Sequence, residues 1–154
     1  MTRILVVALW LAMTCVQPRA ANAVGGAAGG RQAAPEYDRV VQLIEAEEYH
    51  SAIPVLERLH RAEPENADVL NLLGFAHRKL GRLKPAFRFY REALAIEPLH
   101  LGANEYLGEL HLERGELGAA LKRLDVLETA CPKGCEERDE LADAIAAHRK
   151  ARDQ

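Results

Sequence analysis

Two cysteines near the C-terminus are the residues best suited to covalent chemistry. Cys131 and Cys135 frame the segment Cys-Pro-Lys-Gly-Cys. In an oxidising compartment, cysteines at this short spacing favour a disulfide, which would fix the end of one helix to the start of the next. A redox-active or metal-binding pair and two free thiols remain open. The spacing differs from the Cys-x-x-Cys of thioredoxin-like motifs, and two cysteines do not complete a tetrahedral metal site.

The other residue types that serve catalysis or metal binding form no recognisable constellation. Gly-x-Ser-x-Gly, the Walker loop and His-Glu-x-x-His do not occur in the sequence. The acidic pairs Glu47-Glu48 and Glu136-Glu137 are interpreted as solvated helix ends. We therefore predict no catalytic residue, no bound metal and no cofactor. No metal-ligand spacing is present among the scattered histidines His50, His60, His100 and His148.

Composition predicts that these residues are carried by helices. The chain has 154 residues, enough for one domain, of which 49% are hydrophobic and 28% charged. Ala, Leu, Glu and Arg are abundant and favour helix, whereas aromatic residues make up only 5%. Because strand-forming residues are sparse, we expect an all-α protein.

The N-terminus predicts export. Arg3 precedes an uncharged apolar run over residues 4–16, and Ala21-Asn22-Ala23 has the small-x-small pattern of a signal peptidase site. Residues 1–23 are therefore predicted to be a signal peptide, cleaved after Ala23, which places the mature protein in the periplasm or outside the cell. The apolar run is shorter than the roughly 20 residues that cross a bilayer, so we expect no stable membrane insertion after cleavage.

Two alternatives to cleavage after Ala23 remain open, namely an uncleaved N-terminal anchor and a lipoprotein attached through Cys15. The formal net charge is −3, and the predicted signal peptide holds Arg3 and Arg19 but no acid, so the mature chain would be more acidic. That charge argues against nucleic acid and anionic membranes as partners. Residues 24–35 are rich in Gly and Ala and are predicted to be a flexible linker.

Several residues recur at an offset of 34 positions. Three prolines, three alanines, two Leu-Gly pairs, two glycines and two histidines follow this period: Pro64, Pro98 and Pro132; Ala52, Ala86 and Ala120; Leu73-Gly74 and Leu107-Gly108; Gly81 and Gly115; His77 and His111. Small residues at such positions let helices approach closely, and a glycine suits a turn that requires a positive φ. Self-similarity at this period is the signature of a repeat architecture.

With this period and these residues, the chain resembles the tetratricopeptide repeat family. The matching units span about 33–64, 67–98 and 101–132, within a repeat region of 36–132. The first unit matches least, because Arg39-Val40 stands where Leu-Gly would be. The resemblance implies three antiparallel helix pairs in a right-handed superhelical stack. Asn66 is a plausible N-cap for the second pair.

The segment after the last unit is predicted to close the stack. Residues 133–150 carry Leu141, Ala144, Ile145 and His148 at helical spacing on one face. We interpret this segment as a C-terminal capping helix that covers the last repeat.

The resemblance also implies a concave groove lined by the first helix of each unit. Its exposed positions would be Tyr37, Val41 and Ile44, then Asp68, Asn71, Phe75, Arg78 and Lys79, then Glu105, Glu109, Leu112 and Glu113. Asn71 is the first choice, because a groove Asn can pair with a peptide backbone through both its donor and its acceptor. An ordinary solvated face is the alternative.

The sequence argues against a family subclass that clamps the C-terminal carboxylates of chaperones with Lys, Asn and Arg. Tyr37, Val41, Leu72, Gly102 and Tyr106 occupy the clamp positions. The sequence therefore predicts a non-catalytic exported adaptor that binds a peptide or protein subunit. A small periplasmic protein that handles thiols or metals through Cys131 and Cys135 is the alternative, together with a self-associating homo-oligomeric scaffold.

Overall fold

The protein is a stack of helices, as the sequence predicted. The structure is a computed structural model that describes residues 29–152. Seven helices follow one another in this range, which contains no strand, and they confirm three helix pairs with a terminal helix. They are α1 (Gly29–Glu45), α2 (Tyr49–Ala62), α3 (Ala67–Lys79), α4 (Leu83–Ile96), α5 (Leu101–Glu113), α6 (Leu117–Ala130) and α7 (Glu136–Arg152).

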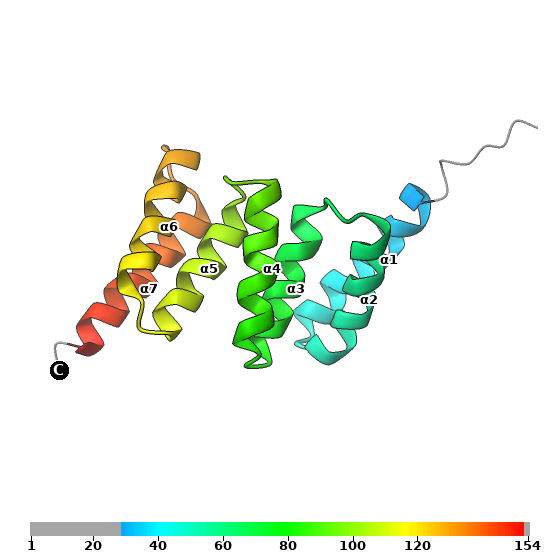
Figure 1. The fold of residues 1–154 in the computed structure, drawn as a ribbon, viewed down its shortest axis with the longest axis horizontal. Coiled ribbons are helices and arrows are strands. Elements are labelled where there is room, and N and C mark those ends of the chain that lie inside the picture. Colours follow the sequence, from blue (N-terminus) through cyan, green and yellow to red (C-terminus); the bar gives the residue numbers. More distant parts are fainter. Residues whose placement is uncertain (1–28, 153–154) are drawn as a thin grey trace, which may run out of the picture.

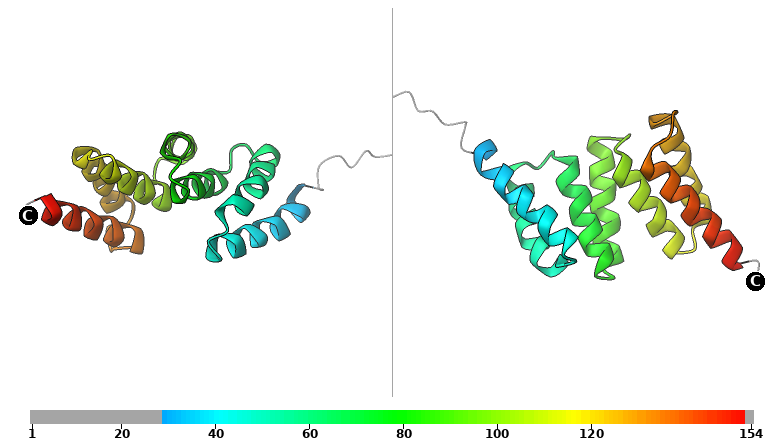
Figure 2. Two further views of the ribbon diagram at one scale, coloured as in Figure 1. Left: turned by 90° about the horizontal axis from the view of Figure 1, so that it is seen from below. Right: turned by 180° about the vertical axis from the view of Figure 1, so that it is seen from behind.

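The helices form an arch. Each packs on its neighbours in sequence, and α7 packs on both α5 and α6. Figure 1 shows α2, α4 and α6 on the near side of the stack. The view from below in Figure 2 shows α4 on the outer side of the arch and α1 and α7 at its two ends. The inner side therefore lies between α1 and α7, over α3 and α5. None of the described helices is long and apolar enough to cross a membrane.

Helix boundaries follow the residues that the sequence analysis identified. Gly81 and Gly115 occupy the turns within the second and third pairs with φ of +70° and +74°, where a side chain would be strained. The Asn66 side chain caps α3 by accepting a hydrogen bond from the Val69 backbone N–H at 3.1 Å. Each repeated proline lies two residues beyond the end of a helix, because the residue before proline disfavours the helical conformation.

The first helix begins earlier than the sequence suggested. It starts at Gly29, inside the 24–35 segment for which we predicted a flexible linker. Arg31, Gln32 and two alanines are good helix formers and extend the helix backwards past Pro35, while Val40 is fully buried in the core and anchors α1. The predicted signal peptide over residues 1–23 lies outside the described residues.

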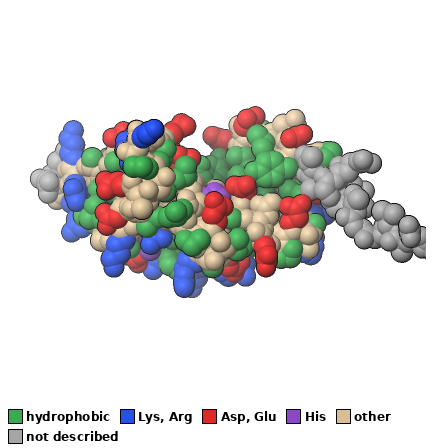
Figure 3. All heavy atoms as spheres, turned by 90° about the horizontal axis from the view of Figure 1, so that it is seen from above, with side chains coloured by type: hydrophobic (Ala, Val, Ile, Leu, Met, Phe, Trp, Pro, Cys, Tyr) green, Lys and Arg blue, Asp and Glu red, His purple; other side chains and the backbone are tan. Residues whose placement is uncertain are grey.

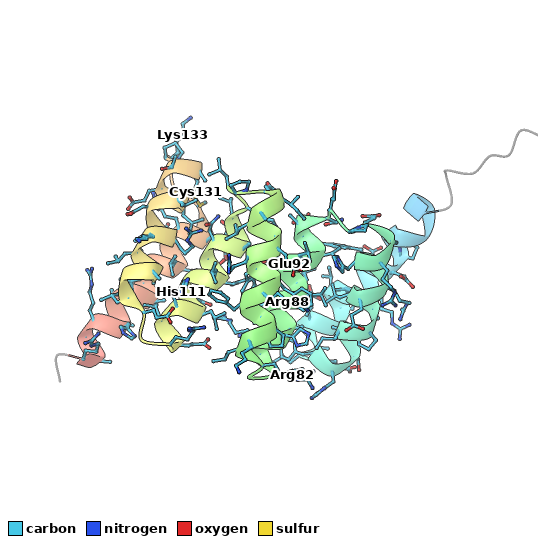
Figure 4. All side chains as sticks on the ribbon, in the orientation of Figure 1. Arg82, Arg88, Glu92, His111, Cys131 and Lys133 are labelled. Carbon is cyan, nitrogen blue, oxygen red and sulfur yellow. A yellow bond between two sulfur atoms is a disulfide. The ribbon has the colours of Figure 1, made fainter. Side chains whose placement is uncertain are left out.

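The C-terminal helix is tied to the last repeat in two ways. Cys131, directly after α6, and Cys135, directly before α7, form a disulfide, as predicted. Figure 4 shows Cys131 at the end of the stack where α6 finishes. Leu141 and Ile145 of α7 are buried in a cluster with Leu112 and Leu127. The capping helix thus excludes water from the face of the last pair that would otherwise be open.

Candidate functional site

Three aromatic side chains from three helices meet on the inner part of the stack. Phe75 of α3 lies edge-to-face with Tyr49 of α2, with ring centroids 6.0 Å apart. It also lies 4.9 Å from the ring of Tyr106 of α5. All three are half-buried, so each still presents part of its ring to solvent. The Lys79 ammonium lies 5.2 Å from the Phe75 ring. We call Tyr49, Phe75 and Tyr106 the aromatic cluster; half-exposed aromatic surface of this kind supplies the anchors of many protein interfaces.

Arg78 links α3 to α5 beside this cluster. Its guanidinium forms ion pairs with Glu109 and, at 3.1 Å, with Glu113, and it lies 5.7 Å from the Tyr106 ring. The Arg78 side chain is only 9% exposed. A cavity of about 450 Å³ opens here between α3, α5 and α7, lined by Arg78, Glu109, Leu112, Glu113, Ala144 and His148. Figure 3, which views the molecule from the other end of the helices, shows that the inner side of the arch is hollowed between the two ends of the molecule.

Asn71 lies in the same inner region, between α3 and α5. The residue is 8% exposed, and its Oδ1 has no hydrogen-bond partner in the described part of the chain. Its Nδ2 lies 3.0 Å from the position that a Cβ on Gly102 would occupy, so the amide packs closely on the start of α5. This oxygen is covered by protein atoms, so the amide that was the first choice for a peptide contact is not open to a peptide in this structure.

Several predicted groove residues keep the exposure that was expected of them. Val41, Asp68 and Lys79 are exposed, and Tyr37 is half-buried. Burial and the negative charge of Asp68 raise the pKa of Tyr37. The Asp68 carboxylate lies 3.1 Å from Nε2 of His100, whose Nδ1 accepts a hydrogen bond from the Ala103 N–H and so caps α5.

Three of the predicted groove residues are not exposed. Asn71, Glu105 and Leu112 are 8%, 3% and 9% exposed, so the expectation of an open surface at these positions is wrong. Leu112 is buried because α7 lies across α5 and brings Leu141 and Ile145 against it. Glu105 faces the same helix, whereas Asn71 is covered by α5.

Glu105 belongs to an acidic group between α5 and α7. Burial, a hydrogen bond with the Glu140 side chain and the charge of Glu109 together raise the pKa of Glu105 to about 9. The Glu105 carboxyl is therefore protonated at neutral pH and donates to Glu140. Glu137 and Glu140 add further negative charge from α7. Since both carboxylates paired with Arg78 also lie here, the inner face beside α7 carries an excess of acid.

The two repeated histidines pack against aromatic rings. His77 stacks on Phe89 with ring centroids 5.4 Å apart, and burial lowers its pKa. His111 lies edge-on to Phe87 at 5.6 Å, and its Nδ1 is 2.7 Å from a Glu116 oxygen. Among the described residues no group of three or more His, Cys, Asp or Glu is arranged to hold a metal ion.

Sequence reasoning missed the participation of Tyr49 and Tyr106. Tyr49 opens the second helix of the first pair, which was not expected to reach the inner face. Tyr106 was considered only for a clamp that it cannot form. A signal did exist, because aromatic residues are few in this chain and two of the four tyrosines lie here.

Comparison with solved structures identifies the architecture. The second TPR domain of human RPAP3, in complex with the HSP70 peptide SGPTIEEVD, matches with a TM-score of 0.65. The match covers 75% of this chain and 97% of that domain, at 21% sequence identity. The chain has the tetratricopeptide repeat fold. The Yersinia enterocolitica type III secretion translocator chaperone SycD matches this TPR chain with a TM-score of 0.71 at 16% identity, over 81% of this chain and 88% of SycD.

SycD in complex with a peptide of the translocator YopD also matches, with a TM-score of 0.67 and 17% identity over 79% of this chain and 92% of that one. No family model matches the sequence. A sequence relative is the probable biofilm formation methyltransferase WspC of Pseudomonas aeruginosa, 33% identical over 104 residues, or 66% of this chain. The matched region spans 25% of WspC, so the TPR chain corresponds to about a quarter of that protein.

Proposed function

We propose that this TPR chain is a non-catalytic adaptor that holds a peptide or protein subunit on the inner face of its arch. The aromatic cluster carries the proposal, because Tyr49, Phe75 and Tyr106 present half-buried ring surface from three helices on the inner part of the stack. The fold neighbours are consistent with this role, since SycD and RPAP3 were solved with bound peptides.

The charge of the inner face indicates what kind of peptide would bind. Arg78 is already paired with two carboxylates, so Lys79 is left as the cation beside the aromatic cluster. On the inner face, Asp68 of α3 is exposed, and the acidic group between α5 and α7 lies nearer the C-terminal end of the stack. An acidic peptide such as the one held by RPAP3 would meet this acidic surface. We expect a partner segment with apolar anchors flanked by Lys or Arg.

Substitution of Phe75 by Ala is expected to lower the affinity for such a partner segment by about tenfold or more, because it removes the centre of the aromatic cluster. Peptides enriched against the wild-type protein from a displayed random library provide the probe, and fluorescence anisotropy gives their affinities. The matched control is Leu99→Ala, which removes an exposed apolar side chain from the connection between α4 and α5, outside the aromatic cluster.

Circular dichroism establishes that both variants fold. Enriched peptides that carry Lys or Arg next to apolar residues should bind Leu99→Ala with unchanged affinity. Basic peptides that bind Phe75→Ala as tightly as wild type, or a library that yields no basic binder, would contradict an adaptor that uses this face.

We also propose that the adaptor acts outside the cytoplasm. Support comes from the predicted signal peptide and from a disulfide, which persists in oxidising compartments. Expression of the full chain in a bacterial host should give a periplasmic protein whose N-terminal residue is Val24. N-terminal sequencing of the fractionated protein provides the measurement. Recovery of the intact chain from the cytoplasm with Met1 in place would overturn export.

A further inference from the structure

A second cavity lies on the opposite side of the stack from the aromatic cluster. It has a volume of about 420 Å³ and is formed by α4, α5 and α6. Its apolar lining comes from Phe87, Leu94 and Leu107, and its charged lining from Arg91, Lys122 and Arg123. Figure 4 shows His111 pointing into the space between α4 and α6 on the near side of the molecule. We call this the outer cavity.

Arg123 is held in place by a buried side chain. Its guanidinium donates a hydrogen bond to Oδ1 of Asn104 at 3.1 Å. Asn104 is fully buried, and its Nδ2 donates to the backbone oxygens of Pro98 and His100 at 3.1 and 2.9 Å. The amide is therefore fixed by α5 and its preceding loop, and it orients the guanidinium without neutralising it. A guanidinium that is already ordered loses little entropy when it binds a carboxylate.

Two carboxylates near the outer cavity are paired with other cations. Glu116 pairs with His111 and Arg114, and Glu92 lies 3.9 Å from Arg88. No ion pair to Arg91, Lys122 or Arg123 forms among the described residues, whereas Arg78 on the inner side has two. In Figure 3, Lys and Arg side chains gather along the lower edge of the view, which is the side of α2, α4 and α6. The two faces of the arch therefore differ in charge.

We propose that the outer cavity binds an acidic segment of a partner protein through one bulky apolar side chain flanked by carboxylates. A Leu-sized or Phe-sized group would occupy the apolar lining, and Arg91, Lys122 and Arg123 would pair with carboxylates on either side of it. The chain is net acidic, so a nucleic acid is a poor fit. This site does not depend on whether the inner face is occupied.

An adaptor with both sites would join two partners of opposite charge. The basic segment would lie on the inner face and the acidic segment on the outer face, separated by the thickness of a helix pair. When both partners are bound, each is held close to the other. The effective concentration of one partner around the other therefore rises, although the adaptor makes no additional contact.

The test uses a fluorescein-labelled short peptide of Asp and Glu with one central Leu. Two control peptides replace the Leu with Ser or the acids with Lys. The double variant Arg91→Glu/Lys122→Glu should bind the acidic peptide with an affinity lower than that of wild type by about tenfold or more. Added salt should lower the affinity of the wild-type protein for the same peptide. Lys150→Glu is the matched control, because Lys150 is an exposed cation on α7 away from the cavity.

Phe87→Ala should lower the affinity for the Leu peptide and leave the weaker affinity for the Ser peptide unchanged. This result would show that the Leu side chain enters the cavity and that charge attraction alone does not account for binding. Phe75→Ala should have no effect, so failure of this site is distinguishable from failure of the inner face. Equal binding to wild type and the double variant would overturn the proposal. So would binding that Phe75→Ala removes, equal affinity for the Leu and Ser peptides, or binding of dodecanoate by a protein that does not bind the acidic peptide.

Discussion

Substitution of Gly74 by Ala is expected to lower the free energy of unfolding by about 2 kcal/mol, although alanine is the better helix former. A Cβ at this position would lie 2.5 and 2.6 Å from two carbons of the Tyr90 ring, closer than real Cβ atoms approach. Tyr90 is fully buried and packs in a cluster with Ala86, Leu107 and Leu110, so the ring has no space into which to retreat. Overpacking should therefore exceed the gain in helix propensity.

Urea unfolding followed by circular dichroism measures this change. Gly118→Ala is the matched control, because Gly118 also lies in a helix, α6, and its Cβ would meet no atom within 4 Å. That variant should be as stable as wild type or slightly more stable. If Gly74→Ala were equally tolerated, α3 and α4 would not be as close as the repeat requires.

The close approach at Gly74 is also where sequence reasoning succeeded. The 34-residue period identified which residues must be small, and small residues at helix crossings are dictated by backbone distance. The same reasoning located the turns at Gly81 and Gly115, because a positive φ leaves glycine as the favoured residue. Features that recur in each unit could be predicted because the physical constraint recurs with them.

The exposure of Glu105 and Leu112 could not be predicted by the same rule. We expected positions that correspond between repeats to be equally exposed. The last unit, however, has α7 as its neighbour, where a middle unit has another repeat. Leu112 consequently packs on Leu141 and Ile145. The outer cavity was missed for a related reason, since it is formed between units and depends on how Asn104 orients Arg123. Contacts that do not recur at a fixed offset along the chain produce no periodic pattern in the sequence, so they could not be predicted from it.

The burial of Glu105 predicts that the stability of this TPR chain depends on pH. The pKa of Glu105 is raised from 4.5 to about 9 in the folded state, so between these values the folded chain holds a proton that the unfolded chain releases. The resulting stabilisation is fully present below about pH 4.5 and is lost as the pH rises to about 9. The slope from this one group would approach about 1.4 kcal/mol per pH unit.

Glu105→Gln should remove this dependence. The amide is neutral at every pH and can donate to Glu140 as the protonated carboxyl does, so the variant should exceed wild type at pH 7 by up to about 3 kcal/mol. The groups facing residue 105 are Glu109, Glu137, Glu140 and Tyr106, and all remain in the variant. Unfolding in urea at several pH values gives the comparison.

The exposed Glu128 provides the control, since Glu128→Gln should leave the pH profile of the wild type unchanged. The decisive quantity is the difference between the unfolding free energies of Glu105→Gln and wild type, which should widen steadily from pH 5 to pH 8. A constant difference over that range would mean that Glu105 is ionised in the folded protein. In that case α7 would not bury this carboxyl against Glu140, and the acidic character assigned to the inner face would be stronger by one charge.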